Sequence, residues 1–329
     1  MRFSLIVPVY NRPDEVAELL ESMTRQTVKA FEVILIEDGS TVSSEPVAAR
    51  YAGRLSLSYF RIPNSGPGKA RNYGADRASG DYLVVLDSDC ILPPDYIRSV
   101  GDALDADDVD AFGGPDRAAP NFTDIQKAIN YAMTSFFTTG GIRGGHRKLD
   151  KFYPRSFNMG IRRDVYARLG GFSDMRFGED IDFSLRLYAA NCTVRLFPAA
   201  WVYHKRRTGW KKFYRQVCNS GIARIHLYIK YPHSLKAVHF LPACFTLGTL
   251  ICLAGTYFWA WSSAPLPVYA LLVCADATAK NKSLKIGLLA VVASCIQLTG
   301  YGCGFLLAAW NRLILKKGAF SVFKRTFYR

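Results

Sequence analysis

A stretch of 39 residues without a single Lys, Arg, Asp or Glu runs from Ala237 to Ala275. A second uncharged run extends from Ile286 to Asn311. A helix that crosses a membrane needs roughly 20 consecutive apolar residues, and both runs reach that length. The sequence therefore predicts an integral membrane protein and confines the water-soluble part of the fold to the residues before Ala237.

The charged residues are divided unevenly along the chain. Residues 1–182 hold 26 Asp and Glu against 22 Lys and Arg, whereas residues 183–329 hold 20 Lys and Arg against one acid, Asp276. A strongly basic half can bind nucleic acid or an anionic membrane surface. Because the basic residues surround the uncharged runs, we expect membrane lipids as the partner and no nucleic acid.

The basic residues before the first uncharged run indicate how the chain meets the membrane. Residues 203–236 carry nine Lys and Arg, no acid and interleaved aromatic residues, which predicts amphipathic helices in the membrane interface on the cytoplasmic side. Residues 237–311 are then a transmembrane segment of two or three helices, and 312–329 are a basic tail. The favoured segments lie near 238–261, 265–279 and 286–310, the second being short or re-entrant.

The first 100 residues alternate apolar strands with amphipathic helices. Strands are expected at Phe3–Val9, Phe31–Ile36, Leu55–Ile62 and Tyr82–Leu86. Helices are expected after Pro13, with an apolar face of Val16, Leu19, Leu20 and Met23, and at Lys69–Ala78. This pattern predicts an α/β domain over 1–202 with a doubly wound, mostly parallel sheet, whose ligands bind at the carboxyl ends of the strands.

Acidic residues follow the fourth strand and recur near residue 180. Asp87 and Asp89 supply hard oxygen ligands for Mg²⁺ or Mn²⁺, and a nucleotide diphosphate would complete the shell of ligands. A short acidic turn is the alternative. Glu179, Asp180 and Asp182 precede an apolar helix expected at Phe183–Ala190. An acidic helix N-terminus is the alternative there.

These motifs form an ordered set. In chain order they are Val7-Pro-Val-Tyr-Asn11, Glu37-Asp-Gly-Ser40, Asn64-Ser-Gly66 with Lys69-Ala-Arg-Asn72, Asp87-Ser-Asp89, Asn158-Met-Gly160, Gly178-Glu-Asp180, and His204 with Arg215-Gln216. Together they resemble the family 2 inverting glycosyltransferases of the GT-A fold over about residues 3–220. The membrane half resembles, more loosely, the C-terminal helices of bacterial members that build surface polysaccharides.

The resemblance implies a role for each matching residue. Asp180 would be the general base that takes a proton from the acceptor hydroxyl, and His204 would be a metal ligand or else plain interface charge. Asp38 would bind the nucleotide base or else cap a turn. The implied nucleotide contacts are Pro8, Tyr10, Arg12, Asp38, Lys69, Arg71, Asp87 and Ser88. The implied metal ligands are Asp87, Asp89 and His204. The implied sugar and acceptor pocket is Asn158, Met159, Gly160, Glu179, Arg215 and Gln216.

The resemblance also implies an activity. We expect an enzyme of the bacterial inner membrane, its catalytic domain on the cytoplasmic face, that transfers a single sugar with inversion. The donor would be a nucleotide sugar, UDP-linked, and the acceptor a polyprenyl-diphosphate-linked lipid or a glycan. A catalytically inactive scaffold and a nucleotidyltransferase are the alternatives. We also expect the glycine-rich loop at 139–145 to be mobile, and Cys90 stands where many relatives carry a further Asp.

Overall fold

The computed structural model describes two compact units. The described ranges are 1–117, 122–139, 152–175, 177–205 and 209–320. The first unit contains residues 1–117 and the described part of 152–205, and the second contains 122–139 and 209–320. Residues 122–139, expected in the first domain, thus belong to the second unit. Most of the glycine-rich loop and the end of the basic tail lie outside the described residues.

A seven-stranded sheet forms the centre of the first unit. Its strands are β1 (Phe3–Val9), β2 (Phe31–Asp38), β3 (Leu57–Ile62), β4 (Tyr82–Leu86), β6 (Ala111–Gly113), β8 (Asn158–Arg162) and β9 (Val194–Leu196). They lie in the order β3-β2-β1-β4-β8-β6-β9. The first four are parallel, and β8 is antiparallel to both β4 and β6. The expected α/β fold with a mostly parallel sheet is confirmed.

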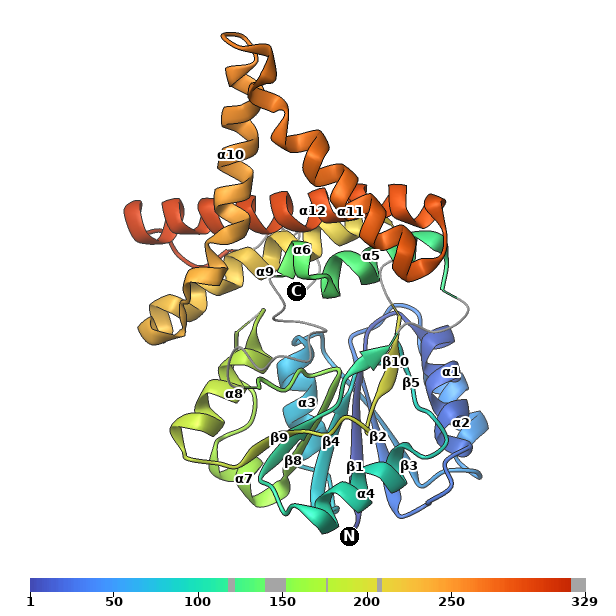
Figure 1. The fold of residues 1–329 in the computed structure, drawn as a ribbon. Helices are drawn as coiled ribbons and strands as arrows, with labels where there is room; N and C mark the ends of the chain where they lie inside the picture. The colour runs from blue at the N-terminus through green and yellow to red at the C-terminus, as the bar shows by residue number, and fades with distance from the viewer. Residues whose placement is uncertain (118–121, 140–151, 176, 206–208, 321–329) are drawn as a thin grey trace. The chain divides into compact units, whose positions relative to one another are not determined.

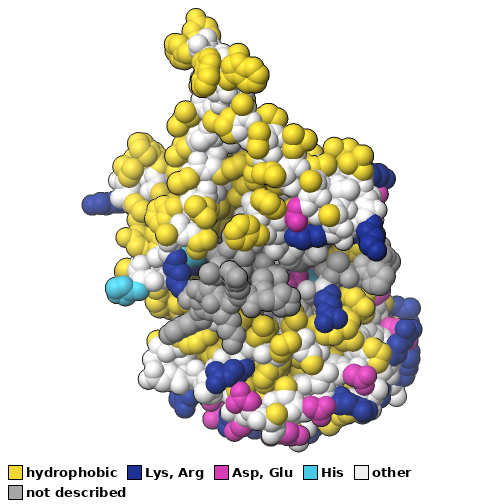
Figure 2. All heavy atoms as spheres, viewed as in Figure 1, with side chains coloured by type: hydrophobic (Ala, Val, Ile, Leu, Met, Phe, Trp, Pro, Cys, Tyr) yellow, Lys and Arg dark blue, Asp and Glu magenta, His cyan; other side chains and the backbone are white. Residues whose placement is uncertain are grey.

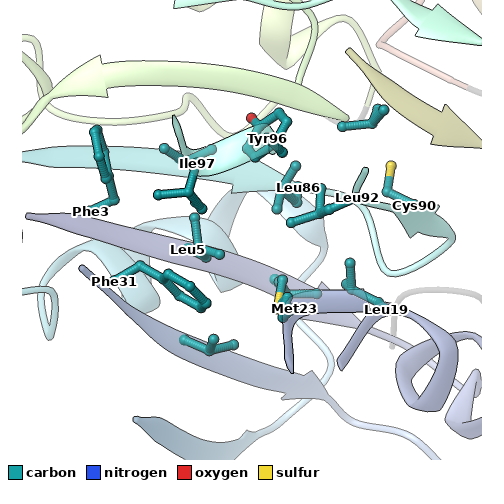
Figure 3. Close-up of a cluster of buried hydrophobic side chains, with 14 of the residues drawn as sticks. Phe3, Leu5, Leu19, Met23, Phe31, Leu86, Cys90, Leu92, Tyr96 and Ile97 are labelled. Carbon is teal, nitrogen blue, oxygen red and sulfur yellow. The ribbon is translucent and has the colours of Figure 1, made fainter. Parts of the chain in front are cut away.

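Helices cover both faces of this sheet (Figure 1). On one face lie α1 (Pro13–Thr24), α2 (Glu45–Tyr51) and α4 (Tyr96–Ala106), and on the other α3 (Pro67–Ala75), α7 (Arg163–Arg168) and α8 (Glu179–Ala189). Because strand side chains alternate between faces, Leu5 packs with Leu19 in one core while Ile6 packs with Phe183 in the other. Figure 3 shows the first of these cores.

The strands and helices expected in the first 100 residues are present, although β2 extends past Ile36 to Asp38 and β3 begins at Leu57 instead of Leu55. The predicted buried face of α1 is fully buried. The helix expected at Lys69–Ala78 begins at Pro67 and ends at Ala75. The helix expected at Phe183 begins at Glu179 instead, after Gly178 with φ +80°. Its acidic residues therefore lie inside the first turn, where the helix dipole favours negative charge.

A small second sheet joins distant parts of the chain. It consists of β5 (Cys90–Ile91), β10 (Val202–His204) and β7 (Asp116–Arg117), with β10 in the middle. β10 is antiparallel to β5, and His204 is paired with Cys90. This pairing, which the sequence did not predict, brings His204 beside the residues that follow β4. Tyr203 and His204 thus belong to the first unit and not to the expected interfacial segment.

The second unit is helical. It contains α5 (Asp124–Thr134), α6 (Phe136–Thr139), α9 (Trp210–Lys230), α10 (Leu241–Gly255), α11 (Pro265–Asn281) and α12 (Leu284–Ala309). The segment expected to hold several amphipathic helices contains one long helix, α9, followed by a short 3-10 turn at Pro232–Ser234. Within the described ranges, one helix, Leu284–Ile314, is long and apolar enough to cross a membrane, and α10 is apolar but shorter.

Candidate active site

The carboxyl ends of three neighbouring strands define the edge of the sheet that carries the predicted site. Val9 at the end of β1 is paired with Glu37 of β2, and Ile6 is paired with Val85 of β4. Tyr10, Asp38 and Asp87 therefore follow or end strands at one common edge. Ligands of open α/β sheets bind at such an edge.

His204 and the two carboxylates after β4 form a cluster. The Nε2 atom of His204 lies 3.2 Å from Oδ1 of Asp89 and 3.9 Å from Oδ2 of Asp87. Arg12 Nη1 donates a hydrogen bond to Oδ2 of Asp89 over 2.5 Å. The ring of Phe157 stacks on the imidazole, with ring centroids 4.8 Å apart. The structure thus brings together Asp87, Asp89 and His204, the three implied metal ligands, and adds Arg12 and Phe157, of which Phe157 is marked by no motif.

The donor atoms of this cluster fit a divalent cation. Asp89, Cys90 and His204 each offer a ligand atom within 4.8 Å of the others. Cys90 is fully buried, burial raises the pKa of its thiol well above the ordinary value, and its Sγ donates to the carbonyl of Phe157. A neutral thiol is a poor ligand. The residues that suit a cation are thus Asp89, Asp87 and His204, which supply oxygen and imidazole nitrogen.

Arg71 joins the two acidic motifs. Its Nη2 lies 2.9 Å from Oδ1 of Asp87, and its Nη1 lies 2.9 Å from Oε1 of Glu179. The Arg71 side chain is only 4% exposed, and its guanidinium lies 5.3 Å from the ring centroid of Phe172. Burial raises the pKa of Glu179 to about 7, although Arg71 opposes this shift. Arg71 is therefore engaged by two carboxylates, and its contact with the nucleotide stays a prediction.

Asp180 stands beside Glu179 in the first turn of α8. Its Oδ1 accepts a hydrogen bond from the amide of Ile181 at 2.8 Å, and its Oδ2 accepts one from Arg155 Nη1 at 3.3 Å. Arg155 was not singled out in the sequence because it stands in a segment without a recognisable motif. Through Glu179 and Arg71, the expected general base is linked to the residues that follow β4.

Asp38 is held by the loop that precedes α3. Its Oδ1 accepts a hydrogen bond from the amide of Ser65 at 2.6 Å, and its Oδ2 accepts one from the amide of Gly66 at 2.9 Å. Both oxygens therefore have protein partners, as the turn-capping alternative requires. The carboxylate side chain is nearly fully buried. A contact with a nucleotide base stays a prediction for Asp38.

Three residues of β8 that were expected in a sugar pocket are buried in the sheet. Asn158 accepts a hydrogen bond from the hydroxyl of Tyr96 at 2.6 Å and donates one to the carbonyl of Ala200 at 2.8 Å. Met159 is fully buried, and a Cβ on Gly160 would lie 2.0 Å from the ring of Phe112. The structure buries Asn158, Met159 and Gly160 within the sheet, and a place in a sugar pocket stays a prediction for these three residues.

The remaining expected residues have diverse surroundings. Lys69 is exposed and lies 3.6 Å from Asp174. Pro8 and Tyr10 are half-buried and Ser88 is buried. Arg215 and Gln216 lie on α9 of the second unit. Nucleotide or acceptor contacts of these six residues stay predictions.

Comparison with other sequences supports the family assignment that the motifs imply. A family model described as glycosyl transferase family 2 matches residues 4–170. The uncharacterized glycosyltransferase YwdF of Bacillus subtilis is 35% identical over 206 residues, which cover 62% of this chain and 74% of that protein. An uncharacterized glycosyltransferase of Rickettsia conorii is 40% identical over 97 residues, which are 30% of this chain and only 16% of that much longer protein.

Two solved structures share the fold. The mannosyltransferase PcManGT from Pyrobaculum calidifontis, in complex with GDP-Man and Mn²⁺, gives a TM-score of 0.57 at 18% identity, covering 96% of this chain and 88% of that one. TarS 1–349 of Staphylococcus aureus gives 0.52 at 19% identity, covering 95% and 92%. These similarities concern the fold alone. Since the family model covers half of the sequence and YwdF is matched over most of its length, the chain belongs to glycosyl transferase family 2.

Proposed function

We propose that this glycosyltransferase moves one sugar from a nucleotide donor, UDP-linked, to a hydroxyl of a lipid-linked or glycan acceptor, with inversion at the anomeric carbon. The observation that carries the proposal is the buried Arg71, which binds Asp87 and Glu179 at once. This ion-pair network couples the carboxylates suited to a cation with the turn that presents Asp180.

In the proposed reaction, the residues after β4 stabilise the leaving group. Asp87, Asp89 and His204 would hold a divalent cation, Mg²⁺ or Mn²⁺, which when bound offsets the charge that develops on the leaving diphosphate. Arg12 fixes the carboxylate of Asp89 through its hydrogen bond. Positive charge beside a departing diphosphate lowers the barrier because it stabilises charge present only in the transition state.

In the same displacement, Asp180 acts as the general base. Its carboxylate takes the proton from the acceptor hydroxyl while that oxygen attacks the anomeric carbon. Arg155 and the amide of Ile181 orient the two carboxylate oxygens. A single displacement with one base and no covalent intermediate inverts the configuration of the sugar.

Further observations support the proposed nucleotide-sugar donor and the proposed membrane location. TarS was solved in complex with UDP-GlcNAc and the Pyrobaculum mannosyltransferase with GDP-Man, so both fold neighbours take nucleotide sugars. The uncharged tract and the basic residues around it favour the cytoplasmic face of a bacterial inner membrane. An enzyme held there meets a polyprenyl-diphosphate-linked acceptor at the bilayer surface, in surface polysaccharide or glycolipid synthesis.

A release assay tests this proposal. Purified full-length protein in detergent is incubated with a panel of nucleotide sugars, in Mn²⁺ and in EDTA, and the products are identified. We expect one donor to give nucleoside diphosphate, and EDTA to abolish its release. Pyrophosphate as the product would identify a nucleotidyltransferase instead, and no turnover of any donor would favour an inactive scaffold.

A pair of variants tests the proposed cation site. Asp89→Ala is expected to abolish nucleoside diphosphate release, as EDTA does, because it removes a proposed ligand and the partner of Arg12. Asp105→Asn, at an exposed position on α4, serves as the matched control and is expected to leave release unchanged. Full activity of Asp89→Ala would refute the assignment of the cation site.

A further inference from the structure

The first uncharged tract is folded as a helical hairpin. α10 and α11 are joined by a 3-10 turn at Ala260–Ser263, and Ser262 Oγ donates a hydrogen bond to the carbonyl of Cys252 at 3.0 Å. We propose that this hairpin enters the lipid bilayer from one side and turns back within it, and that α12 lies along the membrane surface instead of crossing it. This inference rests on the proposed membrane location and not on the proposed reaction.

The outer part of the hairpin has no protein covering. From Leu247 to Leu272, a range that the structure describes completely, no residue is buried and none is charged. The exposed fractions are 88% for Tyr257, 87% for Phe258, 65% for Trp259 and 71% for Trp261. Figure 2 shows the projecting part covered by hydrophobic side chains. An exposed apolar surface of this extent marks an interaction site.

The charges at the base of the hairpin select lipid as the occupant. Lys236 precedes α10, and Lys280 and Lys282 stand where α11 ends. Lysines at both ends of an uncharged segment match the layers of a membrane, because the lysines reach anionic headgroups while the uncharged part lies in the hydrocarbon. The only acid in α11, Asp276, accepts hydrogen bonds from Lys280 and from Tyr131 close to the base.

α12 is packed along α9 for most of its length. A Cβ on Gly300 would lie 2.5 Å from Val217, and one on Gly304 would lie 2.0 Å from the carbonyl oxygen of Cys218. Further along, Ile225 of α9 packs in one cluster with Ala308 of α12. Contacts further along α9 are thus made by residues further along α12, so the two helices run side by side in the same direction (Figure 1).

This packing makes a membrane-crossing α12 costly. α9 carries five cationic side chains, at Lys211, Lys212, Arg215, Arg224 and Lys230. If α12 crossed the bilayer, α9 would be carried in with it, and each Lys or Arg near the middle costs about 2.5–3.5 kcal/mol. At the membrane surface the same side chains reach anionic headgroups. The pair α9–α12 therefore belongs at the interface.

The length of the hairpin indicates that it turns back. α10 has 15 residues, which corresponds to about 22 Å at 1.5 Å per residue, against a hydrocarbon core of about 30 Å. A hairpin of this depth places both of its bases on one side. Ser283, before α12, and Gly318, after it, are then also on that side.

Thiol labelling at three positions tests the inference. Single cysteines are placed at Ser283, Gly318 and Ser262 in a full-length chain without other cysteines, and inverted and right-side-out vesicles are treated with a membrane-impermeant maleimide. We expect Ser283→Cys and Gly318→Cys to react only in inverted vesicles, and Ser262→Cys in neither. Labelling of Ser283 and Gly318 from opposite sides, or of Ser262 from outside, would overturn the inference.

A second measurement uses the unaltered sequence, in case the cysteine-free chain does not fold. Fusions of alkaline phosphatase and of a fluorescent protein to either end of the wild-type chain report the side on which each end lies. Both ends are expected to give the cytoplasmic signal, and opposite signals would overturn the inference. A carbonate wash shows which proposal has failed. Release of the protein by the wash would refute the membrane location. Retention of the protein, with α12 found across the bilayer, would refute only the arrangement of the hairpin and α12 proposed above.

Discussion

Asp180 is the general base of the proposed mechanism, so its replacement should affect proton transfer and little else. In Asp180→Asn the amide cannot accept the acceptor proton, but it keeps the shape and the hydrogen bond from Ile181. General-base catalysis contributes about 10²–10⁴-fold, so we expect kcat to fall by that factor. Stabilisation by the nucleotide donor, measured as the shift in Tm, should be unchanged.

The control for this substitution is Asp164→Asn, an exposed carboxylate on α7 of the same unit. It is expected to leave both kcat and Tm unaltered. A kcat of Asp180→Asn close to that of the wild type would show that another group accepts the proton.

Glu179 gives the protein a pH-dependent stability with a definite sign. Burial raises the pKa of Glu179 in the folded chain to about 7 from an ordinary value of 4.5. Between these values the folded state binds more protons than the unfolded state, so this contribution to stability is complete below pH 4.5 and is lost as the pH rises through about 7. Glu179→Gln carries no such proton.

We therefore expect the Tm of the wild type to fall relative to that of Glu179→Gln as the pH is raised across this window. One pKa unit is about 1.4 kcal/mol, and 1 kcal/mol shifts Tm by about 2–4 °C in a domain of this size, so the relative fall should be several degrees. Melting curves of the two proteins that shift in parallel with pH would contradict this account of Glu179.

The residues of the candidate site that could be predicted are those with a local pattern. Asp87 and Asp89 follow an apolar strand, so their position at the sheet edge could be inferred from the sequence. The contact of Arg155 with Asp180 could not, since the two are 25 residues apart and only the folded chain brings them together. Asn158 matched a family motif, yet its amide completes hydrogen bonds inside the core.

Among the elements, β8 depends on a glycine for its fit. A methyl group on Gly160 would lie 2.0 Å from the ring of Phe112, which is itself fully buried. Gly160→Ala should therefore force the sheet or the ring to move and lower the free energy of unfolding by about 1–3 kcal/mol. Thermal or urea unfolding of the purified protein measures this loss.

Gly101→Ala is the matched control at the element scale. A Cβ at Gly101 on α4 meets nothing within 4 Å, and alanine inside a helix is favoured over glycine by about 0.5–1 kcal/mol. Gly101→Ala should thus be neutral or stabilising. Equal destabilisation by both substitutions would show that the close approach of Gly160 to Phe112 does not control stability.

Elements with a long run of apolar residues could be predicted from the sequence, whereas elements of two or three residues could not. β1 has six buried residues out of seven and β4 has five out of five, and the shortness of these apolar runs together with their flanking turn residues favours strands. β6 and β9 have three residues each, too few to show any period, and only pairing with β8 and with each other makes them strands. α5 was assigned to the wrong unit because its partners α11 and α12 lie far away in the sequence.

At the scale of the whole molecule, charge and hydropathy are separated along the chain. The acidic residues stand almost entirely in the first 182 residues, where several form the candidate site, and the second half of the sequence is basic around apolar helices. The two features supply different forces. Basic side chains attract anionic lipid and are screened by salt, whereas burial of apolar side chains in hydrocarbon is insensitive to screening.

This separation predicts two kinds of membrane attachment that a salt wash distinguishes. Wild-type protein should stay in the membrane fraction in about 1 M NaCl, where the screening length falls to about 3 Å, because the hairpin holds it. A variant with Tyr257, Phe258, Trp259 and Trp261 changed to serine keeps its basic residues but loses the exposed apolar tip. It should be retained at low salt and released in larger part at high salt.

The metal-dependent release of nucleoside diphosphate in detergent checks that this variant is folded. The release should equal that of the wild type, because the four residues are remote in sequence from every residue of the candidate site. Two results would contradict the separation of forces. Release of the wild type by salt would mean that charge alone attaches the protein. Full retention of the tip variant would mean that α12 or another apolar segment holds the chain in the bilayer without the tip of the hairpin.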